Sequence, residues 1–480
     1  MIETSIDSSR PLCVDLDGTL IATDALWESL LLLIKTKPLS FFSLPFWLLK
    51  GKAYFKRQLA LRVKLNPASL PYRENVLSFL QKEQERGREI VLATAADEYV
   101  AQGVAAHLGI FAEVLASDGD NNLSGRRKLE ALKKYSGANG FDYIGDAEVD
   151  LSLWQASHRA HLVEPSIALL NKARRVATVG GVFTEKKNNF RSFIKALRVY
   201  QWVKNILLFA PLLMAHKVFE IDRHLQALYA FVAFSLCASC VYIVNDLLDL
   251  EADRLHPHKR HRPFAAGTLP IKAGVLAAPL LLAASFIIAA AFLPAQFFIV
   301  LGLYFTLTTA YSFHLKRVLV VDVLVLAGLY TLRLFAGGIA TNVPISPWLL
   351  AFSMFFFLNL AFVKRFSELH LMQESKQTKS KGRGYVVGDI ELFRSIGPAS
   401  GYLSVVVLCF YINSREVVLL YKHPELLLLI GPFLLYWITR MWLWALRGKM
   451  TDDPIVFTAR DPVSYFIGAL VIAILIIAWM

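Results

Sequence analysis

Residues 245–270 read NDLLDLEADRLHPHKRHRPFAAGTLP and connect two apolar runs, Ala227–Val244 and Ala273–Leu293. The runs contain 18 and 21 residues, and a helix needs roughly 20 apolar residues to cross a bilayer. The stretch between them is polar and strongly charged. We therefore expect two membrane helices joined by a charged segment that begins at the end of the first helix.

Three polar residues at the start of this segment recur every four positions, so a helix places Asn245, Asp249 and Asp253 on one face. Asp246 lies one position after the first and can turn toward the same space. Carboxylates at such a place are costly unless they line water and bind cations. Oxygen ligands in this number suit Mg²⁺, which keeps several waters and shares itself with substrate phosphates. The three residues are candidate metal ligands, and the two aspartates are candidate catalytic residues.

A basic run follows the acidic positions and contains Lys259 and Arg262, two candidate phosphate-binding residues. Acidic groups for a metal, followed by basic groups for phosphate, would hold a pyrophosphate leaving group. The alternative is a solvated helix end without chemistry. The pattern NDxxDxxxDxxHPxKxxRP resembles the first signature of the UbiA-type intramembrane prenyltransferases. The sequence of this motif is most similar to that of the decaprenyl-phosphate phosphoribosyltransferase branch.

Composition agrees with a membrane protein. The chain has 480 residues, a formal net charge of +13 and 55% hydrophobic residues, with many long apolar runs. This combination predicts a polytopic membrane protein. The basic excess needs no nucleic acid, because the cytoplasmic loops of membrane proteins collect Lys and Arg. The first residues lack the apolar core of a signal peptide, so we expect none to be cleaved.

The first third of the chain shows a different pattern, in which short apolar strands alternate with helices and end in polar groups. Pro11–Leu20 is one such strand and contains Asp15 and Asp17; the others are Glu89–Ala93 and Phe141–Ile144. Two carboxylates separated by one residue at the carboxyl end of a strand can point into one crevice. The alternation predicts a doubly wound α/β domain.

Four short motifs in this domain, DLDGT, hydrophobic-Thr, GxxK and GDxxxD, resemble in this order those of the haloacid dehalogenase superfamily. The resemblance implies that Asp15 attacks phosphorus and that Asp17 moves the proton, with both in the Mg²⁺ site. It implies a third metal ligand and three supporting or phosphate-binding residues: Asp146, Asp150, Thr94 and Lys128. This division is chemically sensible, because a metal neutralises the nucleophile and the phosphate while a second carboxylate moves the proton.

Between the first two motifs, residues 25–70 form the expected small helical cap. The cap is aliphatic and aromatic, is flanked by basic residues such as Lys35 and Lys56, and is interrupted by prolines. It is too short and too broken to predict a membrane span. Two interpretations remain open. Either the cap lies on the membrane and accepts a lipid-borne phosphate, or its apolar residues are a cap core.

The remaining chain is expected to be an all-α membrane domain, residues 201–480, after a phosphatase domain at 1–165 and a linker with an amphipathic approach at 166–200. The approach resembles the LRxxQWxKN motif of the same transferase branch, with Lys204 and Asn205 as candidate substrate-binding residues. Nine apolar segments follow: Ile206–His216, Ala227–Val244, Ala273–Leu293, Gln296–Tyr311, Val320–Ile339, Trp348–Phe362, Gly401–Ile412, Glu425–Leu446 and Val463–Met480.

Basic residues alternate between the loops of these segments. Most Lys and Arg lie in the approach, in 254–272, 314–317, 364–394 and 447–460, and few lie in the intervening loops. The positive-inside rule then places the amino terminus and both candidate sites in the cytoplasm, on a bacterial-type inner membrane. An odd number of spans places Met480 on the opposite side.

A second polar cluster resembles the YSxxLKRxxxxDVxxLAxxYxxR pattern of that branch. Its candidate binding residues are Tyr311, Lys316, Arg317, Asp322 and Arg333. A carboxylate inside an apolar segment is costly unless it is paired or functional. Asp322 and Arg333 share a helical face, so a structural ion pair is the alternative. Only one aspartate lies here, where prenyltransferase relatives show a second aspartate-rich motif. This difference favours a site in which Lys and Arg bind one end of the donor.

Two further loops, 364–394 and 447–460, carry similar chemistry. Lys364 and Arg365 are candidate substrate-binding residues, with a topological role as the alternative. The stretches Gly382–Tyr385 and Asp452–Pro454 lie beyond them. The motif DDPxVF, which begins at Asp452, also resembles the phosphoribosyltransferase branch.

Two functions are compatible with the membrane domain. In the first, a polyprenyl phosphate attacks 5-phosphoribosyl diphosphate, and Mg²⁺ helps pyrophosphate to leave. In the second, a polyprenyl diphosphate ionises and an aromatic or other small acceptor captures the cation. The many basic side chains and the fused phosphatase favour the first, because phosphoribosyl transfer leaves a 5-phosphate that a phosphatase could remove.

Overall fold

The computed structural model of the chain describes residues 10–185, 188–217, 219–374, 384–450, 454–458 and 460–480. The chain divides into two units. The first comprises Met1–Leu197 together with Tyr242–Ala278, and the second comprises Arg198–Val241 together with Pro279–Met480. Each unit is described by itself below.

A parallel sheet forms the centre of the first unit, with strand order β3-β2-β1-β4-β5-β6. Its strands are β1 (Leu12–Val14), β2 (Ile90–Asp97), β3 (Glu113–Ser117), β4 (Asp142–Gly145), β5 (Ala160–Val163) and β6 (Val179–Phe183). In β1, Leu12 lies opposite Ile90 of β2 on one side and Asp142 of β4 on the other. Because the strand order reverses at β1, the carboxyl ends of β1 and β4 border a crevice.

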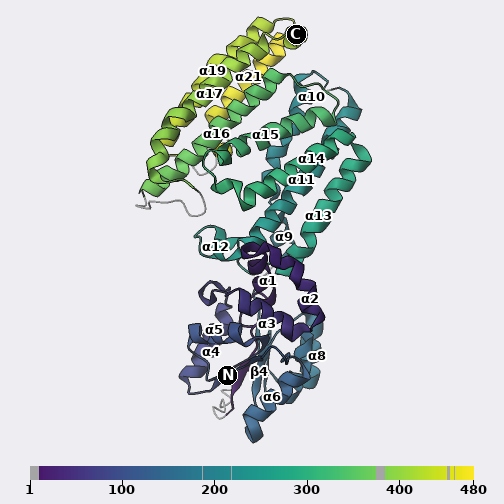
Figure 1. Cartoon of the computed structure of the whole chain (residues 1–480), viewed down its shortest axis with the longest axis vertical. Helices are drawn as coiled ribbons and strands as arrows, with labels where there is room; N and C mark the ends of the chain where they lie inside the picture. Colours follow the sequence, from purple (N-terminus) through teal and green to yellow (C-terminus); the bar gives the residue numbers. More distant parts are fainter. Residues whose placement is uncertain (1–9, 186–187, 218, 375–383, 451–453, 459) are drawn as a thin grey trace. The chain divides into compact units, whose positions relative to one another are not determined.

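Helices cover both faces of this sheet (Figure 1). They are α4 (Glu74–Glu85), α5 (Glu98–Leu108), α6 (Arg126–Ser136), α7 (Leu151–Ala156) and α8 (Ile167–Val176). Side chains alternate across a strand, so Leu12 and Val14 join one apolar core with α4 and α5, whereas Cys13 joins the other with α6 to α8. The predicted doubly wound α/β fold is confirmed.

The sheet extends beyond residue 165, where we expected the domain to end and a linker to begin. Helix α8 and strand β6 both lie within the expected linker, and β6 pairs in parallel with β5. Strand β6 contains two adjacent glycines, Gly180 and Gly181. In the structure, a Cβ added at Gly180 would lie 2.9 Å from the ring of His161 on β5. These glycines therefore let β6 approach a buried histidine.

The cap consists of α1 (Ala25–Thr36), a 3₁₀ turn, α2 (Leu44–Leu49) and α3 (Lys52–Arg62). It has a small core of its own that includes Leu33 and Leu59. The 3₁₀ turn and α2 contribute little to this core and present six apolar side chains that are each more than half exposed. These are Leu39, Phe41, Phe42, Phe46, Leu48 and Leu49.

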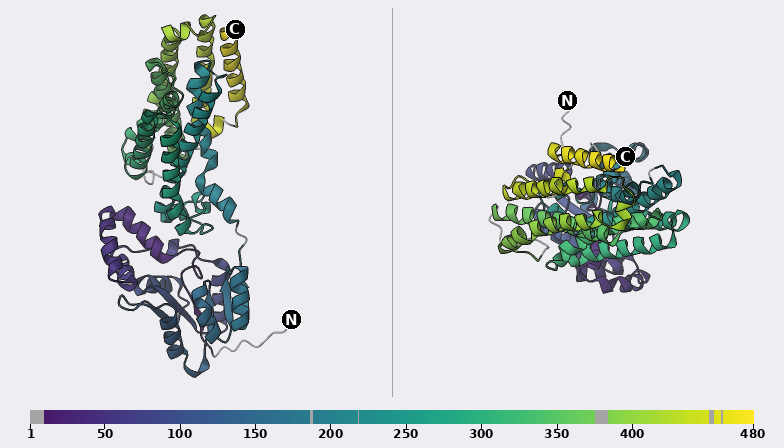
Figure 2. Two further views of the ribbon diagram at one scale, coloured as in Figure 1. Left: turned by 90° about the vertical axis from the view of Figure 1, so that its right-hand side faces the viewer. Right: turned by 90° about the horizontal axis from the view of Figure 1, so that it is seen from above.

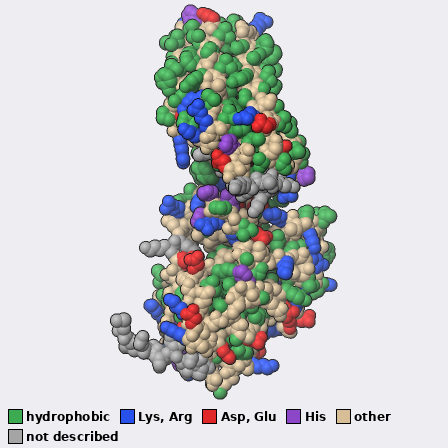
Figure 3. Space-filling view, turned by 90° about the vertical axis from the view of Figure 1, so that its left-hand side faces the viewer, with side chains coloured by type: hydrophobic (Ala, Val, Ile, Leu, Met, Phe, Trp, Pro, Cys, Tyr) green, Lys and Arg blue, Asp and Glu red, His purple; other side chains and the backbone are tan. Residues whose placement is uncertain are grey.

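Long apolar helices lie side by side in the second unit (Figure 2). In the described part of the chain, eight helices are long and apolar enough to cross a membrane. They are α11 (Ile221–Leu248), α13 (Ile271–Phe292), α14 (Ala295–Phe313), α15 (Val321–Ala340), α16 (Pro347–Glu374), α17 (Ile390–Ile412) with the 3₁₀ turn before it, α19 (Ile430–Leu446) with the 3₁₀ turn before it, and α21 (Pro462–Trp479). Hydrophobic side chains dominate the surface of this unit (Figure 3). The protein is therefore a multi-span membrane protein.

The first of the nine predicted apolar segments has a different form. It lies mainly in a 3₁₀ helix, η5 (Val199–Phe209), and a short helix, α10 (Ala210–Met214). A 3₁₀ helix rises about 2 Å per residue and an α-helix about 1.5 Å. The sixteen residues from Val199 to Met214 can therefore extend over roughly 30 Å, which is about the thickness of the hydrocarbon core.

Candidate active sites

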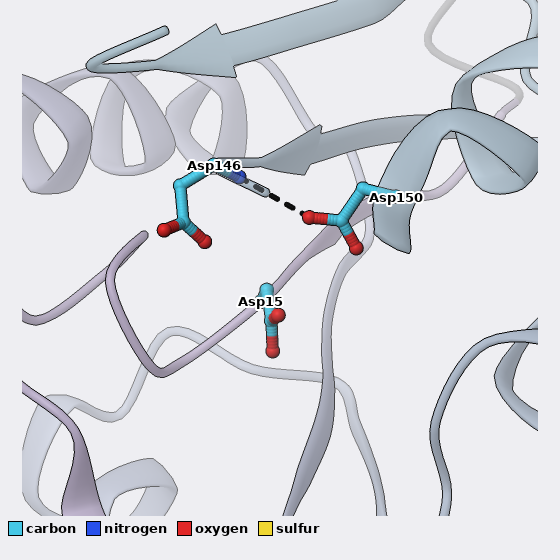
Figure 4. Close-up of side chains that lie close together, drawn as sticks. All are labelled: Asp15, Asp146 and Asp150. Carbon is cyan, nitrogen blue, oxygen red and sulfur yellow. Dashed lines mark hydrogen bonds between the residues drawn. The ribbon is translucent and has the colours of Figure 1, made fainter. Parts of the chain in front are cut away.

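Three aspartates converge at the carboxyl ends of β1 and β4 (Figure 4). Asp15 directly follows β1, Asp146 directly follows β4, and Asp150 ends a short 3₁₀ turn beyond it. One carboxylate oxygen of each lies within 4.8 Å of the others. Among the described residues, this is the one group of three or more acidic, His or Cys side chains that could hold a metal ion. Carboxylate oxygens in this number suit Mg²⁺.

Two glycines allow these carboxylates to approach. Gly18 has φ +75°, and an added Cβ would lie 2.2 Å from Oδ2 of Asp146. At Gly145 an added Cβ would lie 2.5 Å from Oδ2 of Asp150. The hydroxyl of Thr19 donates a hydrogen bond to Asp146 Oδ1 at 3.0 Å. The sequence motif DLDGT thus needs its glycine for space as well as for the turn.

A buried lysine and a tyrosine complete the cluster. Lys128 Nζ lies 3.1 Å from Asp15 Oδ2 and donates to the hydroxyl of Tyr143, also at 3.1 Å. That hydroxyl donates to Asp150 Oδ1 at 3.2 Å. The other oxygen of Asp150 accepts the N–H groups of Asp146 and the next residue at 3.2 and 3.1 Å. Asp150 thereby fixes the loop that carries Asp146, a candidate metal ligand.

Burial, and then the charge of neighbouring carboxylates, raise the pKa of several of these groups. The pKa of Asp17 rises to about 8, first because burial removes the carboxyl from water and then because Asp24 is close. Burial and the charge of Asp15 raise the pKa of Asp146 to about 7 and that of Asp150 to about 6. A divalent cation would oppose the repulsion between these carboxylates. A carboxyl that keeps its proton near neutral pH, as Asp17 does, can donate it to a leaving oxygen.

The structure adds a cap residue that sequence reasoning had not assigned to the site. Lys56 on α3 donates to the carbonyl of Ala95 at 2.6 Å and to Asn122 Oδ1 at 2.9 Å. It lines a cavity of about 20 Å³ together with Asp17. Burial lowers its pKa, while the charges of Asp17 and its acidic neighbours oppose that shift. In the sequence, the one signal for Lys56 was its position among the basic residues that flank the cap.

Two other side chains hold the loops around this site. The expected phosphate ligand Thr94 is fully buried, and its Oγ accepts the N–H of Ala96 at 3.0 Å. Arg73, which sequence reasoning did not select, donates through Nε to the carbonyl of Gly18 at 3.0 Å. Arg73 therefore supports the turn on which the crowded carboxylates depend.

The acidic motif at the end of α11 also belongs to the first unit. Arg262 donates through one nitrogen to Asp246 Oδ1 at 3.1 Å and to Asp253 Oδ2 at 2.6 Å. Lys35 of α1 lies 2.9 Å from Asp249 Oδ1. Arg262, a candidate phosphate ligand, is therefore paired with two carboxylates here. The main chain keeps the helical register, since Asp249 N–H donates to the carbonyl of Asn245 at 2.9 Å. Lys259 lies in the exposed 3₁₀ turn that follows.

In the second unit, Arg333 is the centre of a buried polar cluster. Its guanidinium donates to Asn205 Oδ1 at 2.8 Å, to the hydroxyl of Tyr304 at 2.9 Å and to the carbonyl of Leu329 at 2.7 Å. The amide of Asn205 in turn donates to a serine hydroxyl on α11. The ring of Tyr330 also lies beside this guanidinium. The structure thus gives Arg333 neutral partners.

Asp322 forms a separate cluster and is not paired with Arg333, although both lie on α15. Arg365 Nε donates to Asp322 Oδ2 at 2.5 Å, and the hydroxyl of Tyr385 donates to the other oxygen. The same guanidinium contacts Glu368 at 2.8 Å and the hydroxyl of Tyr311 at 3.0 Å. Because helix geometry constrains only one element, the sequence could not show which element supplies the partner.

The remaining candidate residues lie around these clusters. Lys316 and Arg317 occupy a short 3₁₀ turn after α14, and Lys364 lies on α16 beside Arg365, partly buried. Lys204 lies 5.9 Å from the ring centre of Tyr330. Of the other loop residues considered, Gly382, Arg383, Asp452 and Asp453 lie outside the described residues.

The UbiA prenyltransferase family matches residues 206–460, just over half of the chain. The chain belongs to the UbiA prenyltransferase family. The haloacid dehalogenase-like hydrolase family matches residues 12–155. This UbiA family member therefore carries an N-terminal haloacid dehalogenase-like domain, and the two resemblances drawn from the motifs are confirmed.

Three relatives illustrate how far the similarity extends. An uncharacterized protein of Sinorhizobium fredii, y4nM, is 38% identical over 475 residues, which cover 98% of this chain and 92% of that protein. Nodulation protein NoeC of Azorhizobium caulinodans is 33% identical over 277 residues, or 57% of this chain and 88% of NoeC. The decaprenyl-phosphate phosphoribosyltransferase of Mycobacterium tuberculosis is 39% identical over 186 residues, or 38% of this chain and 61% of that enzyme.

Proposed function

We propose that this UbiA family member makes a lipid-linked ribose in two steps. An oxygen of a polyprenyl phosphate attacks C1 of 5-phosphoribosyl diphosphate, and the bond from C1 to pyrophosphate breaks. The N-terminal domain then hydrolyses the 5-phosphate of the product and releases inorganic phosphate. The observation that carries this proposal is the presence of a complete phosphatase-type cluster in a chain that is 39% identical, over 186 residues, to a decaprenyl-phosphate phosphoribosyltransferase.

The phosphatase step follows from the cluster around Asp15. An oxygen of Asp15 would attack phosphorus, while the nearby ammonium of Lys128 stabilises the negative charge that gathers on the phosphoryl oxygens. Asp17 would donate its proton to the leaving sugar oxygen and later take a proton from the attacking water. Mg²⁺ bound by Asp15 and Asp146 would neutralise charge on the phosphate.

Lipid binding in the transfer step is supported by a cavity of about 360 Å³ in the second unit. Its walls are mostly apolar and include Leu207, Leu213 and Phe357, with Lys204 and Tyr330 among the lining residues. An isoprenoid chain suits such walls, and an ammonium group at one of them suits a phosphate. Lys204 was a candidate substrate-binding residue from the sequence alone.

Binding of the donor is assigned to the motif at the end of α11. Asn245, Asp249 and Asp253 supply oxygen donors suited to Mg²⁺, and the basic segment after them supplies cations for pyrophosphate. Asp249 and Asp253 each face a cationic side chain in the structure. These ion pairs are compatible with carboxylates that would release Lys35 and Arg262 when a metal binds.

For topology we propose that the amino terminus and both active sites face the cytoplasm of an inner membrane. Eight candidate spans together with the extended segment Val199–Met214 make nine crossings, which would place the carboxyl terminus on the opposite side. The six exposed apolar side chains of the cap favour the interpretation that the cap lies on the membrane surface.

The test uses purified protein with Mg²⁺, a polyprenyl phosphate and radiolabelled 5-phosphoribosyl diphosphate. We expect label to move to the lipid fraction, and the product of Asp15→Asn to keep a phosphate that the wild type removes. Asp249→Ala should abolish label transfer and spare hydrolysis of a small phosphate ester. The proposal is wrong if the lipid stays unlabelled while the prenyl group of a polyprenyl diphosphate is transferred to an aromatic acceptor with release of pyrophosphate.

A further inference from the structure

Helix α1 of the cap contacts both candidate sites of the first unit. Its first turn serves the phosphatase site, because the N–H of Ala25 donates to Asp17 Oδ1 at 2.7 Å. Its last turn carries Lys35, which lies 2.9 Å from Asp249 of the acidic motif. The helix has 12 residues and is therefore about 18 Å long. One short helix thus links the proton donor of one reaction with a candidate metal ligand of the other.

Two further contacts fix the cap against the acidic motif. Arg254 of α12 (Leu250–Arg254) donates to both oxygens of Glu28 at 2.6 and 3.2 Å, and both side chains are buried. Asn66, in the stretch after α3, donates to Glu251 at 3.0 Å. Removing either partner of a buried charged pair is strongly destabilising, because the remaining charge is left uncompensated. The cap and the motif therefore form a specific interface.

This interface encloses a cavity of about 250 Å³. Apolar side chains such as Leu32, Leu65 and Leu248 form much of its wall, and Lys35 and Asn66 provide polar groups. Such a mixture does not suit a free sugar or a bare hydrocarbon chain. It suits a molecule with a phosphate or sugar at one end and isoprenoid carbon at the other.

The net charge of the cavity would change sign if a divalent cation bound at Asp249. The cavity lining contains two carboxylates and two cationic side chains, and Asp249 lies beside Lys35 as a further carboxylate. The net charge of these groups is minus one, and a divalent cation would make it plus one. Lys35 and Asp249 are each about one-third exposed, so Lys35 can leave this carboxylate and turn to an anion.

We propose that this cavity binds the phosphorylated headgroup of a lipid-linked sugar between the two reactions, with Lys35 as a phosphate-binding residue. This inference rests on the proposed function and specifies where its intermediate is held. The phosphate would contact Lys35, and the first isoprene units would pack against the leucines. The headgroup would then lie along α1, which leads to Asp17.

The first test locates the ligand with two photoreactive probes, a diazirine analogue of farnesyl phosphate and the same analogue of farnesol. Labelling uses the full-length Asp15→Asn protein in nanodiscs with Mg²⁺, because this variant lacks the candidate nucleophile and should not hydrolyse the probe. We expect the phosphate probe to label residues 28–36 and 65–70, and to do so about tenfold less in Lys35→Met, because a hydrogen bond to a charged group is lost. The matched control Lys37→Met should not change labelling, since Lys37 contacts only the carbonyl of Arg62 among its described polar partners. Equal labelling by the farnesol probe, or none in these peptides, would overturn the inference.

The second test follows the intermediate. In Lys35→Met with an intact Asp15, the phosphorylated lipid-linked product should accumulate, whereas the control Lys37→Met should clear this product as wild type does. Normal clearance of the phosphorylated product by Lys35→Met would contradict the assigned role. If wild type transfers no phosphoribosyl group at all, the proposed function fails, whereas the probe labelling still decides whether the cavity takes an isoprenyl phosphate.

Discussion

The buried pair of Asp322 and Arg365 gives the sharpest quantitative prediction for the membrane domain. Their side chains are 0% and 1% exposed, and the Nε–Oδ2 distance is 2.5 Å. Replacing Arg365 with Leu keeps an apolar side chain at this position but removes the charge and the hydrogen-bond donors. It leaves the Asp322 carboxylate in the interior with the hydroxyl of Tyr385 as a described hydrogen-bond donor.

Removing one partner of a buried ion pair costs about 3–5 kcal/mol, because the remaining charge keeps its desolvation penalty without compensation. Arg365→Leu should therefore lower the free energy of unfolding by that amount. Asp322→Asn should have a similar effect by leaving the guanidinium with fewer partners. The double variant should cost less than the sum of the two, with a coupling energy of about 2 kcal/mol or more.

The assay is reversible unfolding of the purified full-length protein in mixed dodecylmaltoside and SDS micelles, followed by circular dichroism. The control is Arg317→Leu, because Arg317 is exposed in a loop. A surface substitution of this kind should change stability by less than about 0.5 kcal/mol. Additive effects of the two single variants would refute the reasoning and would favour separate substrate-binding roles.

Three more predictions concern the first unit. Gly18→Ala should abolish phosphatase activity, because its Cβ would lie 2.2 Å from Oδ2 of Asp146, a candidate metal ligand. The control Gly87→Ala is also at positive φ but has open space around it, so it should keep activity within about twofold. Equal losses of activity in the two variants would contradict this. Burial lowers the pKa of His161 to about 4, so the unfolded state binds a proton between about pH 6.5 and 4 that the folded state does not. His161 should therefore lower the hydrogen-exchange protection of β5 by up to about 3 kcal/mol as pH drops through this window, measured as the difference between wild type and His161→Phe. The exposed control His158→Asn should behave as wild type. Leu49 of the cap is 85% exposed, so Leu49→Glu in the full-length protein should weaken contact of the cap with anionic vesicles, measured by lipid quenching of tryptophan fluorescence. Unchanged quenching would contradict a cap that lies on the membrane.

Local sequence determined much of this protein. The order of four short motifs predicted the α/β domain, because the motifs follow its alternation of strands and helices, and the family match confirmed it. Long apolar runs predicted membrane helices, since hydropathy over about 20 residues is a local property. The residues gathered at the phosphatase cluster, Asp15, Lys128, Asp146 and Asp150, were all named from these motifs.

Tertiary structure decided which charges meet. Asp322 and Arg333 share a helical face, yet Asp322 is paired with Arg365 on α16 and Arg333 with Asn205. Helical periodicity cannot show such partners, because they come from other elements. Likewise, no spacing links Lys35 with Asp249, 214 positions away, although they lie 2.9 Å apart. Pairing across such separations depends on how whole elements pack, which no single stretch of sequence encodes.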